Sequence, residues 1–217
     1  MATPGKLGAV YAPVTDEEDE LLLQENVEEV FDTHTELTSE FQLANEYVLR
    51  DSETVEIYNT GAATYEETNA YEINYITGLV KLDEATDEDV KVTYDALDSD
   101  VEGNFLEQVA GFFDWSLDEN PNLEESPEFG DDVVTHTATL GSWSGSADKY
   151  WSVEDRFRDW LGKEIVLALY MNTSDGKRQR YEGWAKIGDK STTCPVDTLV
   201  DETINFEGQT KLEYREA

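Results

Sequence analysis

The sequence has 217 residues and a formal net charge of −35, from 50 Asp and Glu against 15 Lys and Arg. Such a charge opposes compaction in dilute salt, but at about 1 M salt the Debye length falls to roughly 3 Å. The composition excludes a basic nucleic-acid-binding face, and eight Phe, eleven Tyr and five Trp argue against a disordered chain. Because the acids are spread along the chain, we expect a folded protein adapted to concentrated salt.

The chain begins with a predicted strand followed by a predicted helix. Residues 5–14 (GKLGAVYAPV) have the composition of a short strand. Thr15 and Glu18 fit a capping box at a helix N-terminus, and acidic residues 16–20 suit a first turn. Apolar residues then recur at helical spacing, at Leu23, Val27, Val30 and Phe31. We therefore predict a helix from Thr15 to about Phe31.

Between Phe41 and Leu97 the apolar period changes to two, which is typical of half-buried strands. The alternation is clearest at Val55, Ile57, Tyr71, Ile73, Val90 and Val92. Thr77-Gly78 separates two apolar runs, Tyr71–Ile76 and Leu79–Leu82, and predicts a tight hairpin. This stretch is therefore predicted to form a small β module.

The middle of the chain is less regular. Apolar spacing over residues 99–113 fits a helix, but Gly103 and Gly111 weaken it, so helix and strand both stay open there. Strand-like alternation follows at Phe113, Trp115 and Leu117. Residues 118–132 contain two prolines and predict a loop.

The last third predicts strands around one helix. Alternation predicts a strand over 133–140, and a continuous apolar run predicts a strand over 165–171 that is buried on both faces. A helix is predicted from Ser152 to Gly162, because one face gathers Val153, Phe157, Trp160 and Leu161. Further strands are predicted at 180–187, 200–206 and 212–214. Strands outnumber helices, so the predicted fold class is mainly β (α+β).

Sites for common chemistry are missing from the sequence. Cys194 is the single cysteine, which excludes an internal disulfide and a cysteine-based zinc site. Neither His34 nor His136 has a Cys or His at ligand spacing, and no nucleophile elbow or phosphate-binding glycine loop occurs. No apolar run is long enough to span a membrane. We expect no enzyme activity, no metal, no cofactor, and synthesis in the cytoplasm without a signal peptide.

One cluster of basic residues stands out in a chain that has few cations. Lys177, Arg178 and Arg180 lie beside a predicted turn at Asp175-Gly176. A local concentration of cations suggests an acidic partner, such as another copy of this chain. A solvated hairpin tip explains it equally well, and both interpretations stay open.

The C-terminal half resembles the major tail tube proteins of tailed viruses. The likeness runs through LGSWSGSADKYWSVEDRFRDWLGKEIVLALYM, then RYEGWAKI, then TCPVDTLVDETINFEGQTKL. The residues that carry it match an R-Y-x-G-x-A pattern and a later P-V…I-x-F-x-G run, namely Arg180, Tyr181, Gly183, Ala185, Pro195, Val196, Ile204, Phe206 and Gly208. Met1–Val10 resembles the start of that family, whereas Thr15–Asp98 has no counterpart in its compact members.

The resemblance implies a tail-tube-type β-sandwich or barrel with one flanking helix, formed by residues 1–14 and 99–217, with residues 15–98 as an inserted or decorating β module. It implies a subunit that assembles into stacked rings, hexameric in form, whose lumen conducts DNA without binding it specifically. Its partners would be copies of itself and the tape measure, baseplate and tail terminator proteins, in a virion tail assembled in the host cytoplasm, without a membrane. Together with the acidic composition, the resemblance implies a virus that infects halophilic archaea.

The resemblance also implies residues for subunit contacts or packing. Phe157 and Trp160 would anchor the helix on the sheet, and Trp143, Tyr150 and Trp151 would pack beside it or at a contact. The full set is Trp143, Trp151, Phe157, Trp160, Lys177, Arg178, Arg180, Tyr181 and Trp184. Two alternatives stay open: another virion part (neck, capsid-decorating or baseplate), and a halophilic carbohydrate-binding module or glycosidase that uses the five Trp to stack on sugars.

Overall fold

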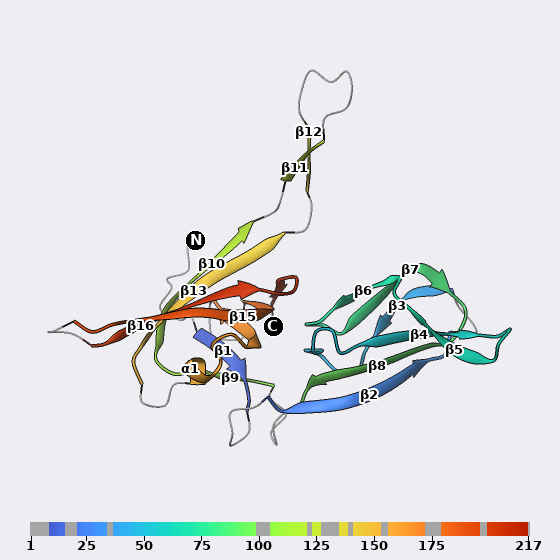
Figure 1. The fold of residues 1–217 in the computed structure, drawn as a ribbon, viewed down its shortest axis with the longest axis horizontal. Helices are drawn as coiled ribbons and strands as arrows, with labels where there is room; N and C mark the ends of the chain where they lie inside the picture. Colours follow the sequence, from blue (N-terminus) through green and yellow to red (C-terminus); the bar gives the residue numbers. More distant parts are fainter. Residues whose placement is uncertain are drawn as a thin grey trace. The chain divides into compact units, whose positions relative to one another are not determined.

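The computed structural model describes residues 9–15, 21–33, 37–98, 105–120, 123–126, 135–138, 141–152, 156–171, 179–195 and 199–216. Within these ranges the chain is mainly β, in agreement with the predicted fold class, with one short helix (Figure 1). It divides into two compact units. Unit 1 holds the described residues up to Ala12 and from Gln108 onward, and unit 2 is Pro13–Glu107, which contains all of the predicted module of residues 15–98.

An eight-stranded sheet in the order β10-β13-β16-β15-β14-β1-β9, with β17 paired to β15, forms unit 1, except that the last residue of β1 and the first two residues of β9 fall within the bounds of unit 2. Its strands are β1 (Ala9–Pro13), β9 (Leu106–Gln108), β10 (Phe112–Asn120), β13 (Ser142–Tyr150), β14 (Glu164–Tyr170), β15 (Arg180–Thr193), β16 (Asp201–Gly208) and β17 (Glu213–Arg215). The predicted strands over 165–171, 180–187, 200–206 and 212–214 are therefore confirmed, with β15 longer than expected.

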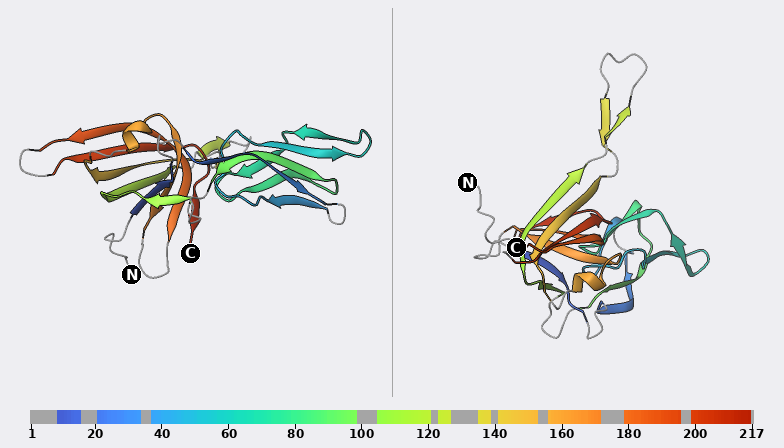
Figure 2. Two further views of the ribbon diagram at one scale, coloured as in Figure 1. Left: turned by 90° about the horizontal axis from the view of Figure 1, so that it is seen from below. Right: turned by 60° about the vertical axis from the view of Figure 1, so that its left-hand side comes forward.

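The connection between β9 and β10 explains the curvature of this sheet. The two strands stand at opposite ends of the strand order, yet only residues 109–111 join them. From Gln108 to Phe112 the chain can span at most about 14 Å. The sheet must therefore curve until its ends approach, as Figures 1 and 2 show, and it encloses one apolar core.

Trp143 belongs to that core, and two glycines make room for it. Its indole N–H donates a hydrogen bond to the Thr210 carbonyl at 2.7 Å. A Cβ at Gly183 would lie 2.5 Å from the indole, and a Cβ at Gly208 would lie 2.2 Å from it. Real Cβ atoms do not approach so closely, so this indole position requires glycine on both β15 and β16.

The predicted helix of Ser152–Gly162 is shorter in the structure. Helix α1 spans Arg156–Asp159, and residues 153–155 lie outside the described residues. Phe157 and Trp160 are both buried in the core of unit 1, with ring centroids 5.2 Å apart. Four residues of helix have little stability of their own, so this contact with the sheet holds α1 in place.

Unit 2 is a sandwich of two sheets. One has the order β2-β8-β4-β5 and the other β3-β7-β6. Their strands are β2 (Leu23–Phe31), β3 (Thr38–Gln42), β4 (Thr54–Asn59), β5 (Thr64–Thr68), β6 (Tyr71–Asn74), β7 (Leu79–Thr86) and β8 (Val90–Leu97). Both sheets contribute to one buried cluster that includes Val55, Val80, Leu82, Val90 and Val92. The predicted hairpin at Thr77-Gly78 is confirmed as β6–β7, with Gly78 at φ 69°.

The helix predicted up to Phe31 is wrong: Leu23–Phe31 is strand β2, and residues 16–20 lie outside the described residues. The cause is a β-bulge. Between Gln24 and Val27 strand β2 carries one more residue than its partner β8, and Asn26 takes φ 54°. An extra residue turns a spacing of two into a wider one that imitates a helical repeat. Beyond the bulge Val27, Glu29 and Phe31 face inward, and Val30 is exposed.

The loop predicted over 118–132 is also partly wrong. Strand β10 continues to Asn120, and β11 (Leu123–Ser126) pairs antiparallel with β12 (Thr135–Ala138) in a two-stranded sheet. The strand predicted over 133–140 is confirmed at β12. In the stretch left open between helix and strand, the described residues form β9 and the start of β10, with 99–104 outside the described residues.

A hydrogen-bonded tyrosine ties the inward Glu29 of unit 2 to its core. The buried Tyr94 hydroxyl donates to the Glu29 carboxylate, which also accepts from the Ala44 backbone N–H at 3.0 Å. Burial, followed by the hydrogen bond to Glu29, raises the pKa of Tyr94 to about 12 from 10.0. Burial and the nearby Glu53 likewise raise the pKa of Tyr71 to about 12.

We expect these tyrosines to make unit 2 sensitive to alkali. A group whose pKa is higher in the folded state contributes stability that is complete below the unfolded pKa and is lost as pH rises through the folded one. Stability should therefore fall between about pH 10 and pH 12, and Tyr94→Phe should flatten that fall. Urea midpoints measured by circular dichroism across this range test the prediction, with Tyr58→Phe as control. An equally steep fall in Tyr94→Phe would contradict it.

Candidate assembly surface

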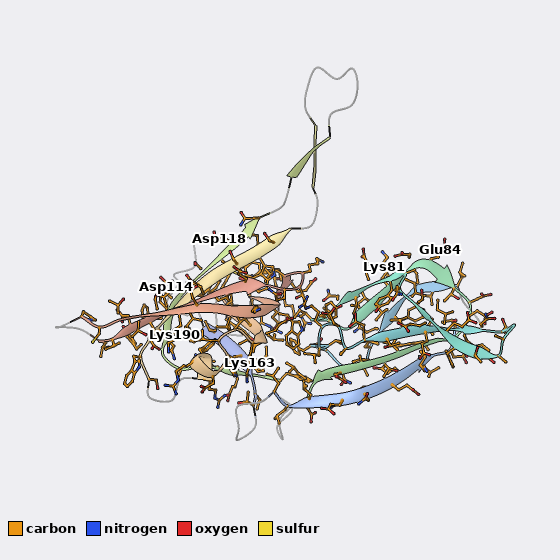
Figure 3. The ribbon with its side chains drawn as sticks, viewed as in Figure 1. Lys81, Glu84, Asp114, Asp118, Lys163 and Lys190 are labelled. Atoms are coloured by element: carbon orange, nitrogen blue, oxygen red, sulfur yellow. The ribbon has the colours of Figure 1, made fainter. Side chains whose placement is uncertain are left out.

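The outward side of β10, β13, β16 and β15 forms a hydrophilic surface, which we call the acidic face. It is defined by the side chains opposite the core in residues 114–120, 142–148, 201–207 and 186–193. Pairing of the strands sets these side chains in rows, such as Asp114 beside Asp148 and Asp118 beside Ser144. Figure 3 shows Asp114 and Asp118 along β10. All of the side chains on this face are exposed or half-buried.

Six carboxylates and small polar side chains make up nearly all of the acidic face. The carboxylates are Asp114, Asp118, Asp148, Asp189, Asp201 and Glu207, and the neutral residues are Ser116, Asn120, Ser142, Ser144, Ser146, Ser191, Thr193, Thr203 and Asn205. Lys186 is the one basic side chain on the described part of this face. The face therefore carries strong negative charge, and a large aromatic side chain, Tyr150, stands only at its end, opposite Asp201.

Hydrogen bonds hold the side chains of the acidic face against one another. The Ser116 and Ser146 hydroxyls are 3.0 Å apart across β10 and β13, and the Asn205 amide donates to the Asp189 carboxylate at 3.2 Å. The Thr203 hydroxyl donates to Asp148 at 2.5 Å. Short side chains bound in this way lose little rotamer entropy, so these bonds can fix them on the face at low cost.

On the core side of the same strands, one buried carboxylate is held between two lysines. Glu202 is 1% exposed, and its oxygens lie 3.6 Å from Lys149 Nζ and 2.9 Å from Lys190 Nζ. The Thr192 hydroxyl donates to it at 3.3 Å. A bulge between Ile187 and Lys190 shifts the alternation of β15 and places Lys190 on the core side.

A second buried carboxylate is held between two arginines. Glu182 is fully buried, accepts a hydrogen bond from Arg180 Nε, and lies 3.1 Å from Arg215 Nε. The Arg180 guanidinium also sits over the Tyr170 ring, 5.4 Å from its centroid. Arg180 of the predicted basic cluster is thus bound within its own chain, whereas Lys177 and Arg178 lie outside the described residues.

The other predicted contact residues lie mostly inside the unit. Trp143, Phe157, Trp160 and Trp184 are buried. Tyr181 is half-buried and packs against the core, with the Tyr214 ring 5.4 Å away. Trp151 differs from these residues, because 52% of it is exposed. Among the described members of the set it is the one aromatic available at the surface.

Trp151 belongs to an exposed apolar group that we call the aromatic patch, formed by Phe113, Tyr150, Trp151 and Leu199. The Phe113 and Tyr150 ring centroids are 4.6 Å apart. The Trp151 backbone N–H donates to the Val200 carbonyl at 2.9 Å, which brings Leu199 to the same end of the sheet. The alternation at Phe113, Trp115 and Leu117 predicts that Phe113 faces the same way as Trp115, which is wrong: Phe113 is exposed, whereas Trp115 packs against the core. The signal was the Phe112-Phe113 pair, because a regular strand buries only one of two neighbours.

Two further classes of site are missing from the described residues. There, no three His, Cys, Asp or Glu side chains are grouped so that they could hold a metal ion. No helix in the described ranges is long and apolar enough to cross a membrane.

Comparison with known proteins finds similarity in structure alone. No protein-family model and no curated protein sequence matches the chain. The tail of an empty GTA particle with C6 symmetry matches at 12% identity and TM-score 0.41, over 54% of this chain and 91% of that chain. The SPP1 tail tube, a hybrid structure from solid-state NMR and cryo EM, matches at 11% identity and TM-score 0.42, over 78% and 80%. At these values the likenesses carry no inference about function.

Proposed function

We propose that this chain is a structural protein of a virion, a tail tube subunit that assembles into stacked hexameric rings and forms a channel for DNA ejection. Unit 1 would build the tube, with unit 2 as an added module. The virus would infect a halophilic archaeon, a proposal that the high acid content supports. Other tail proteins would be its partners at the ends and inside of the tube.

The observation that carries this proposal is the acidic face. A channel for DNA must let a polyanion pass without holding it, and carboxylates repel phosphates while offering them no cation to bind. The face combines six carboxylates with short hydroxyl and amide side chains, and one lysine among its described residues. Within the ranges that define the face there is no large apolar side chain on which bases could stack, and the nearest aromatic residue, Tyr150, lies at its end beside Asp201. The sequence resemblance in residues 101–217 points to the same role.

The placement of the tryptophans argues against the carbohydrate-binding alternative. Sugar stacking needs exposed indole faces, and Trp143, Trp160 and Trp184 are buried. Trp115 packs against the core and donates to the Tyr170 carbonyl at 3.2 Å. Trp151 alone is exposed, and one indole is a small platform for a polysaccharide.

Negative-stain electron microscopy of the purified protein in concentrated potassium chloride tests the proposal. We expect uniform rings or hollow tubes, because salt screens repulsion between copies that each carry −35. Isolated rings that never stack would indicate another virion part, such as a neck protein. A folded protein that stays monomeric at every concentration and salt would contradict the proposal.

A further inference from the structure

The aromatic patch is an apolar surface on a chain that is otherwise covered in carboxylates. Phe113 is 48% exposed, Tyr150 44%, Trp151 52% and Leu199 64%. Each ring has about 150–250 Å² of surface when fully exposed, so the three rings present roughly 300 Å² to solvent. The Phe113 and Tyr150 rings are in contact, and Trp151 and Leu199 lie at the same end of the sheet. An exposed apolar patch of a few hundred Å² is often functional.

The backbone around the patch is fixed, so the patch is a built surface. Phe113 is the extra residue of a bulge between Phe112 and Asp114, which turns Phe112 inward and Phe113 outward. Phe112 then packs edge-on against Phe157, 5.4 Å away. The Tyr150 N–H donates to the Gly111 carbonyl at 3.1 Å, which closes the end of the β10–β13 pair.

The patch continues into an open sheet edge. Strand β10, which contains Phe113, stands at the end of the strand order and pairs only with β13 in the described part of the chain. Its other side therefore offers backbone N–H and C=O groups over Phe112–Asn120. Such an edge invites pairing unless something covers it.

We propose that the aromatic patch and the adjoining edge of β10 form a contact with a second copy of this chain. The inference rests on the proposed function, which requires copies to pack side by side. Two chains of charge −35 desolvate each other's surface most cheaply where the contact itself is uncharged. The four side chains of the patch are uncharged, with Asp114 and Asp201 at its border. A standard interface buries about 800 Å² per partner. The roughly 300 Å² of aromatic surface would therefore form the apolar centre of the interface and not the whole of it.

The test is sedimentation velocity in concentrated potassium chloride on the full chain and on a Phe113→Ser, Trp151→Ser double variant. We expect the concentration for half-assembly to rise by about 30-fold or more, since buried aromatics at the centre of an interface dominate its affinity. A Val30→Ser, Leu37→Ser variant is the matched control, because these side chains are 54% and 69% exposed in unit 2. It should assemble like the parent.

The outcomes separate this inference from the proposed function. If the parent assembles and the double variant assembles equally well, the contact is elsewhere and the proposed function stands. The inference also fails if the unit 2 control weakens assembly as much. If the parent never assembles, both fail.

Hydroxyl-radical footprinting of the unmodified protein gives a second readout that does not depend on a variant folding. Phe113, Tyr150 and Trp151 should become protected from oxidation on assembly, whereas the exposed Leu37 of unit 2 should not. Unchanged oxidation of the patch in assembled protein would overturn the inference.

Discussion

Glu202→Gln is expected to lower the free energy of unfolding of unit 1 by about 3–5 kcal/mol. The substitution keeps the shape of the side chain and removes its charge. It leaves Lys149 and Lys190, whose side chains are 3% and 11% exposed, without their shared carboxylate. Removing one partner of a buried ion pair costs several kcal/mol, and added salt should restore little because buried pairs are screened weakly.

Urea unfolding at constant high salt, followed by tryptophan fluorescence, measures this effect on unit 1 alone, since all five tryptophans lie there. Glu207→Gln on the same strand is the matched control, because its side chain is exposed on the acidic face. It should change stability by less than about 0.5 kcal/mol. Replacing all three buried groups, with Lys149→Met, Lys190→Met and Glu202→Leu, should recover most of the loss. Equal stability of the two single variants would show that the buried cluster contributes nothing.

Gly208→Ala is expected to destabilise unit 1 by about 3 kcal/mol, the upper end of the usual cost of overpacking. The new Cβ would fall 2.2 Å from the Trp143 indole. That indole cannot withdraw, because it is bonded to the Thr210 carbonyl and packed against Phe206, 6.2 Å between centroids. The sheet itself would have to shift.

The comparison for this second prediction is Gly188→Ala on the neighbouring strand β15, where the nearest atom to a new Cβ is 3.4 Å away. It should cost less than about 1 kcal/mol. In a Trp143→Phe background Gly208→Ala should lower the free energy of unfolding much less, because the smaller ring leaves room for the new Cβ. The two substitutions affect the same space in the core, so their effects should not add. Additive effects in that double variant would contradict the packing explanation.

Local pattern was sufficient where strands are regular. The hairpin at Thr77-Gly78 and the apolar strand β14 were predictable, because alternation or continuous burial repeats there without interruption. At two β-bulges the same pattern led to a wrong prediction. The bulge before Val27 imitated a helix, and the one at Phe113 turned an expected inward side chain outward. An extra residue is visible only in the pairing with the partner strand.

The acidic face and the buried charges could not be predicted for a related reason. In a chain with 50 acidic residues, no single Asp or Glu stands out. Asp114 and Asp148 become neighbours, and Glu202 is buried between Lys149 and Lys190, only through the register of β10, β13, β16 and β15. The spacing of these residues along the chain does not indicate that register.

Cryo-electron microscopy of the assembled protein tests the central claim most directly, by showing which surface lines the channel. The proposed function predicts tubes in which the acidic face, with Asp114, Asp118 and Asp148, faces the lumen along its whole length. Tubes or rings in which this face points outward, or is buried between subunits, would contradict it.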